Sequence, residues 1–207
     1  MDHAVALVQA YLQVNGYFTV TEYPVLEALE GGGFQSATDI DLLALRLSGA
    51  GGVLATEPRG ERDRTRTFEP DPELRVAEGH SDLLIVEVKE GRAELNRGAK
   101  NRQVLSAALR RFGLPYHSGI EKSLRELERK GRTKWPNDTW VRMLAFGSIV
   151  DPQVTHGFHA ISLPHVMRYL RTYLDENWDA LRHAQIRHEA FGFLALLEQV
   201  RRADARK

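Results

Sequence analysis

The chain contains no cysteine, and this absence excludes a whole class of chemistry. Its 207 residues can form neither a disulfide nor a thiolate metal site. The sequence also lacks an apolar run of transmembrane length and the basic-then-apolar beginning that is typical of a signal peptide. Together these absences predict a cytoplasmic protein that does not enter a membrane.

The chain also has no excess charge of either sign, with 28 Lys and Arg against 28 Asp and Glu. A protein that coats nucleic acid by bulk charge is normally basic, so any nucleic-acid binding here would need a local basic groove. The length suits one domain with a sizeable core. We therefore predict a single domain over 1–207.

Hydrophobic periodicity predicts an alternation of helices and strands. Helices are expected at 2–14, 96–112, 119–130, 164–181 and near the C-terminus, and strands at 17–25, 37–47, 82–89, 139–148 and 157–163. Pro24 indicates that its strand ends there or lies at a sheet edge. This order predicts an α/β domain with a mixed β-sheet flanked by helices and a C-terminal helical part at 164–207.

Residues 48–80 differ from the rest of the chain. They are rich in glycine, proline and mixed charges, as in "EPRGERDRTRTFEPDPE". Such a composition offers few apolar anchors. We interpret the segment as a long excursion with little core of its own, either a hairpin or a mobile loop.

The stretch "SDLLIVEVKEG" reads as a buried strand until Glu87 and Lys89 interrupt it. Alternate side chains share a face, so both charges lie on the face of Ile85. Charges in such a place are costly unless they are paired or bound to a metal. The pair therefore indicates an ion pair or a metal site.

A second strand, "ATDIDLLALRL", brings Asp39 and Asp41 to one of its faces. If the two strands pair, Asp41 and Glu87 converge. Hard oxygen ligands suit Mg²⁺ or Mn²⁺, which bind phosphate oxygens and lower the pKa of bound water. An ammonium such as that of Lys89 can orient that water or offset developing charge. The arrangement is the outline of a phosphodiester-hydrolysing site.

"TDIDLLAL" followed by "DLLIVEVKEG" resembles the PD-(D/E)XK nuclease superfamily, and "YLQVNGY" resembles the end of the helix that precedes this motif in many members. The resemblance covers roughly residues 1–112. It implies a restriction-endonuclease-like core and a Mg²⁺- or Mn²⁺-dependent nuclease that hydrolyses phosphodiester bonds, in DNA, within a defence, repair or recombination system. It also implies self-association as a homodimer.

Carried over residue by residue, the resemblance makes Asp41 and Glu87 metal ligands, with help from the Val88 carbonyl, and Lys89 the catalytic lysine. Asp39 is either a helper or a strand-edge charge. Many relatives also place a glutamate in the first helix, where this chain offers only Asp2 and Gln9. A single-metal site is therefore easier to support than a two-metal one.

Four basic residues follow the second motif strand and border the expected site, namely Arg92, Arg97, Lys100 and Arg102. Arginine forks and helix N-termini both suit phosphates, so each of the four is a phosphate-binding candidate; a solvated helix face is the alternative. The eight histidines have no tight ligand spacing, and we interpret them as surface or core residues.

Two other functions stay open at the level of sequence. One is a non-catalytic nucleic-acid-binding or assembly subunit that keeps the nuclease fold, which the neutral charge and the missing helix glutamate favour. A weaker alternative is a metal-dependent enzyme that acts on a nucleotide or another phosphate ester.

Overall fold

The structure is a computed structural model that describes residues 2–29, 31–51, 69–96, 98–113, 119–151, 157–184 and 186–205. Its strands are β1 Phe18–Ala28, β2 Phe34–Arg46, β3 Ser81–Arg92, β4 Arg132–Trp135, β5 Thr139–Ile149 and β6 His159–Ser162. Its helices are α1 His3–Val14, α2 Arg102–Arg111, α3 Ile120–Lys130, α4 Leu163–Glu176, α5 Trp178–Leu181 and α6 Glu189–Asp204, with a short 3-10 turn η1 at Pro72–Leu74.

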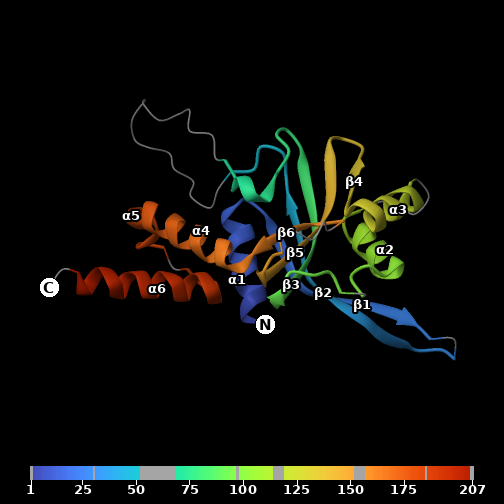
Figure 1. Cartoon of the computed structure of the whole chain (residues 1–207), viewed down its shortest axis with the longest axis horizontal. Helices are drawn as coiled ribbons and strands as arrows, with labels where there is room; N and C mark the ends of the chain where they lie inside the picture. The colour runs from blue at the N-terminus through green and yellow to red at the C-terminus, as the bar shows by residue number, and fades with distance from the viewer. Residues whose placement is uncertain are drawn as a thin grey trace.

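The strands form one mixed sheet in the order β1-β2-β3-β5-β4, with β6 also paired to β5. The β1–β2, β2–β3 and β4–β5 pairs are antiparallel, whereas β3–β5 and β5–β6 are parallel. Helices α1, α4 and α6 cover one face, and α2 and α3 cover the other (Figure 1). The predicted α/β class with a mixed sheet flanked by helices is confirmed.

The central strand β3 explains why its sequence reads as an unbroken apolar run. Leu84 and Val86 face the core cluster under α1 and α4, while Leu83 and Ile85 face the cluster under α2 and α3. A strand covered on both faces has no solvent side, so alternation with polar residues disappears. The covered part ends at Val88, and the strand becomes exposed from Glu90 onward.

Most expected elements are present, and the differences lie at their ends. Pro24 lies inside β1, which is an edge strand, as predicted. The helix expected from residue 96 begins at Arg102, because the Asn101 side chain caps it by accepting a hydrogen bond from the Gln103 N–H. The helix expected to reach 181 ends before Asn177. Strand β4 was not predicted, since four residues are too few to show a period.

The interpretation of 48–80 as an excursion with little core of its own is wrong at its C-terminal end. Leu74 is fully buried in the cluster under α1 and α4. Asp71 is buried too, and its Oδ2 accepts a hydrogen bond from the Tyr11 hydroxyl at 2.7 Å and lies 2.6 Å from His165 Nε2. Local composition cannot reveal such contacts, because both partners are far away in sequence. The part of the excursion at 52–68 lies outside the described residues.

A buried ion pair links the beginning of β3 to β5. Arg142 makes a bidentate contact with Asp82, Nε to Oδ1 at 2.7 Å and Nη2 to Oδ2 at 2.6 Å. The Tyr17 hydroxyl donates to Asp82 Oδ2 at 2.6 Å, and Arg142 Nη1 donates to the Leu74 carbonyl at 2.9 Å. Asp82 thus lies near the beginning of the strand, on the face opposite Glu87, as expected. Together with Arg142 and Tyr17 it links β3 to β5, to η1 and to the residue before β1.

Removing one partner of this pair is expected to leave a buried charge without compensation. Asp82→Ala should lower the free energy of unfolding by about 3–5 kcal/mol, measured by urea denaturation. The control is Asp175→Ala, which breaks exposed contacts with Arg201 and Arg202 and should cost about 0–1 kcal/mol. A loss as small as that of the control would show that the buried pair contributes little.

Candidate active site

The candidate site lies where β2 separates from β3. The pairing of β2 with β3 runs from Arg46 to Leu42, whereas residues 34–40 of β2 pair with β1. The β1–β2 hairpin extends away from the sheet, while β3 continues beside β5 (Figure 1). The strands therefore diverge at the residue after Leu42 in the direction of the hairpin, which is Asp41.

Asp41 takes over a hydrogen bond that the ladder would otherwise make. Its Oδ2 accepts from the Val88 N–H at 2.7 Å, just beyond the last paired residues, Leu42 and Val86. In an antiparallel ladder a hydrogen-bonded residue directs its N–H and its C=O to the same neighbour. The Val88 carbonyl oxygen therefore faces the side of β3 on which Asp41 lies.

Glu87 lies opposite Asp41 in the same register and is only 3% exposed. Its Oε1 accepts from Lys89 Nζ at 2.5 Å and from Asn96 Nδ2 at 2.6 Å. Asn96 is held in turn, because its own Oδ1 accepts a hydrogen bond from the Ala99 N–H. The structure thus brings Asp41, Glu87 and Lys89 together, as the sequence predicts.

Asn96 is a site residue that the sequence analysis missed. It lies in the loop between β3 and α2, where an asparagine reads as an ordinary turn residue. Its nine-residue separation from Glu87 carries no period of a helix or strand. Only the path of the loop back over the end of β3 makes the contact.

Burial raises the pKa of both carboxyl groups. For Glu87, burial and the neighbouring charge of Asp41 outweigh the hydrogen bonds from Lys89 and Asn96. For Asp41, burial outweighs the bond from the Val88 N–H and the charge of Lys89. Burial lowers the pKa of Lys89, but the hydrogen bond to Glu87 and the charge of Asp41 outweigh burial, so the pKa of Lys89 is raised overall. With two adjacent acids and one ammonium, the site has an excess of negative charge that a cation would offset.

The N-terminus of α1 also approaches the site. The charge of Asp2 contributes to the raised pKa of both Asp41 and Lys89. Its Oδ1 caps α1 by accepting from the Ala4 N–H at 2.7 Å. Gln9 is engaged elsewhere, because its amide donates to Thr19 and its Oε1 lies 3.0 Å from His188 Nε2. Of the two helix residues that the sequence offers, Asp2 is the one within electrostatic reach.

Asp39 and Arg92 lie at the edges of the site. Asp39 is exposed and stands opposite Pro24 in the β1–β2 pair. Arg92 is exposed at the end of β3, and its Nη1 lies 3.4 Å from Asp151 Oδ2. Among the described residues, no hydrogen bond or ion pair joins either of them to Asp41 or Glu87, but the charge of Asp39 contributes to the raised pKa of Asp41.

The other basic candidates have different surroundings. Lys100 Nζ lies 5.7 Å from the centre of the Phe158 ring. Arg102 forms ion pairs with Glu121 and, at 3.3 Å, with Glu128, so its guanidinium is held against α3. Arg97 lies outside the described residues. Lys100 forms no salt bridge within the described residues, whereas the guanidinium of Arg102 already pairs with two carboxylates.

The donor set fits a hard divalent cation. Carboxylate oxygens of Asp41 and Glu87 and the carbonyl of Val88 are the ligand types that Mg²⁺ and Mn²⁺ prefer. In the described part of the chain, no group of three or more His, Asp or Glu side chains is placed to hold a metal. An ion here would therefore depend on two side chains, one carbonyl and water.

The raised pKa of Asp41 predicts a pH-dependent stability. Its folded pKa lies above 3.8, so its ionised form costs the folded state free energy at neutral pH, and the cost disappears below 3.8. Asp41→Asn keeps an acceptor for the Val88 N–H and removes the charge. In EDTA it should raise the melting temperature at neutral pH, with a gain that shrinks as the pH falls toward 3.8.

Asp39→Asn is the control, because it removes the same charge from an exposed position on the same strand. It should leave the melting temperature almost unchanged. A gain of equal size for Asp39→Asn, or a loss for Asp41→Asn at neutral pH, would contradict the electrostatic description of the site.

Comparison with known proteins gives no relative for this chain. No family model matches it, and neither a curated protein nor a solved structure does. Within the described residues, no helix has the length and apolar character needed to cross a membrane. A restriction-endonuclease-like core and a nuclease activity therefore remain predictions from the motif residues.

Proposed function

We propose that the protein is a metal-dependent nuclease that hydrolyses phosphodiester bonds in DNA. The observation that carries the proposal is the meeting of Asp41, Glu87 and Lys89 at the point where β2 separates from β3. Buried like charges beside an ammonium are costly, and proteins retain such groups where they serve chemistry.

Asp41, Glu87 and the Val88 carbonyl are the residues that would hold Mg²⁺ or Mn²⁺. Such an ion supplies Lewis-acid chemistry, since it polarises a phosphate oxygen and lowers the pKa of a water molecule. Lys89 carries a full charge near neutral pH, because its pKa is raised, and it offsets negative charge that builds on the phosphate. Asn96 positions the Glu87 carboxylate through its hydrogen bond.

The choice of nucleic acid as substrate agrees with the shape around the site. The site lies at an opening of the sheet, and the β1–β2 hairpin extends from that opening as an arm (Figure 1). An extended polymer can lie along such an arm, whereas a small substrate gains nothing from it. DNA, a homodimer and a defence or repair assembly are implied by the motif resemblance.

A second function is favoured by one observation. Glu87 Oε1 already accepts from both Lys89 and Asn96, so this oxygen is paired by protein donors alone. A chain that had lost catalysis could keep this pair as a structural ion pair. The alternative is therefore a non-catalytic nucleic-acid-binding or assembly subunit with the same fold.

Lys89→Ala separates the two functions. If Lys89 acts on developing charge, cleavage should fall by roughly two orders of magnitude or more, while affinity for DNA and for the metal changes little. Asp41→Ala should abolish metal binding together with cleavage. The measurements are cleavage of plasmid and single-stranded DNA with Mg²⁺ or Mn²⁺, and calorimetric titration of Mn²⁺.

Lys122→Ala, which removes an exposed lysine on α3, is the matched control and should cleave like the wild type. Mn²⁺ should also raise the melting temperature of the wild type and not that of Asp41→Ala. A wild type that cleaves nothing and binds no metal would leave the binding subunit as the function. Unchanged cleavage by Lys89→Ala would show that its pair with Glu87 is structural.

A further inference from the structure

A second region of the sheet has the features of a ligand site. Along one edge, β5 changes its partner, because β4 pairs with residues 139–142 and β6 pairs with residues 144–147. Met143 lies between the two pairings, and its N–H donates to the Gly131 carbonyl at 2.7 Å. The edge is thus interrupted between β4 and β6.

A pocket of about 410 Å³ lies at this interruption. Its volume falls within the range of about 300–1,000 Å³ that is typical of small-molecule sites. Gly131 and Gly157 both line it, and they approach so tightly that a Cβ on Gly131 would lie 2.1 Å from the Gly157 oxygen. Gly131 also has a φ of +64°, so this approach depends on glycine twice.

The pocket is bordered by four cations, Arg75, Lys130, Arg132 and Arg142, and none of its described lining residues is an acid. Asp82 balances the charge of Arg142. The other three form no salt bridge with any residue that the structure describes. The charge of Lys130 also acts on Glu126, and that of Glu73 acts on His159, but neither acid lines the pocket. In a chain of zero net charge, three cations without a salt bridge around one cavity make it locally electropositive.

The half-buried His159 in the same pocket is affected by this charge. Burial lowers the pKa of His159, and the charges of Arg75 and Arg142 lower it further. Its Nε2 lies 2.7 Å from the Glu73 carbonyl oxygen, so the ring is fixed in place and donates that bond. A neutral imidazole adds a flat wall without adding charge.

Flat side chains complete the pocket. Trp140 lines it, and the guanidinium of Arg132 lies 5.7 Å from the centre of the Trp140 ring. Aromatic faces and arginine planes are the surfaces on which nucleobases stack. The combination of several cations with aromatic walls therefore suits a ligand that carries both a phosphate and a base.

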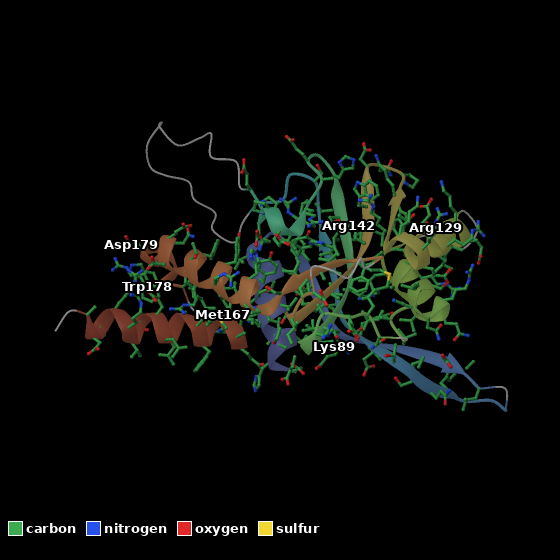
Figure 2. The ribbon with its side chains drawn as sticks, in the orientation of Figure 1. Lys89, Arg129, Arg142, Met167, Trp178 and Asp179 are labelled. Atoms are coloured by element: carbon green, nitrogen blue, oxygen red, sulfur yellow. The ribbon has the colours of Figure 1, made fainter. Side chains whose placement is uncertain are left out.

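We propose that this pocket binds a nucleoside phosphate, with the phosphate held by Arg75, Lys130 and Arg132 and the base against Trp140. The ligand is either a free mononucleotide or the terminal nucleotide of a strand. The pocket is separate from the candidate active site, since Arg142 and Lys89 lie far apart on the sheet (Figure 2). The proposal therefore goes beyond the proposed nuclease function and stands without it.

The test is calorimetric titration of the full chain in EDTA with adenosine monophosphate, adenosine, and a short oligodeoxynucleotide with or without a 5′-phosphate. Adenosine monophosphate should bind and adenosine should bind much more weakly. Hydrogen bonds to charged groups contribute about 1.5–3 kcal/mol each, so Lys130→Glu and Arg132→Glu should each weaken binding about ten- to hundredfold. Arg125→Glu, an equal charge change on the exposed face of α3, should bind like the wild type.

Lys130 and Arg132 are both exposed, so the variants should fold, which circular dichroism checks. Tighter binding of the 5′-phosphorylated strand than of the mononucleotide would identify a strand end as the ligand, and the reverse order a free nucleotide. No binding of either phosphate ligand by the wild type, or equal binding by all three variants, would overturn the proposal. Asp41→Ala should bind adenosine monophosphate normally, so failure of the nuclease function leaves this result unaffected.

Discussion

The end of the β2–β3 ladder at Leu42 and Val86 is the constraint on which the candidate site depends. A strand that leaves its neighbour exposes the next N–H, here that of Val88, and a buried donor without an acceptor is costly. The Asp41 carboxylate supplies the acceptor. The same step places its charge beside Glu87, which the register puts directly opposite. Asp41 thus satisfies the Val88 N–H where the strands separate, and the same side chain brings a second negative charge close to Glu87.

The buried acids at the two ends of β3 differ in how fully other side chains pair with them. At its beginning, Asp82 is matched by the full fork of Arg142 and by the Tyr17 hydroxyl, and Asp71 nearby is bonded by Tyr11. Two residues of the "YLQVNGY" stretch, Tyr11 and Tyr17, therefore donate to buried acids, one beside η1 and one on β3. At the other end, the acids share one lysine and one asparagine. The first arrangement is complete within the chain, and the second leaves capacity for a cation.

Sequence reasoning succeeded where the cause is local. The alternation of faces along a strand predicted that Asp41, Glu87 and Lys89 would meet, and the apolar run of β3 predicted a strand covered on both sides. It failed where the cause is a distant contact. Leu74 and Asp71 lie in a stretch of loop composition, and only helices remote in sequence bury them. Asn96 likewise acquires its role from the path of a loop rather than from any pattern.

The neutral composition of the chain conceals two local fields of opposite sign. The acids at the opening of β2 and β3 form a negative region, and the cations at the interruption between β4 and β6 form a positive one. The two regions lie at different points along the extended β3–β5 pair. Salt screens exposed charges from one another beyond about 10 Å. Zero net charge therefore argues against coating nucleic acid by bulk charge, and it carries no argument against a metal at one region and a phosphate at the other.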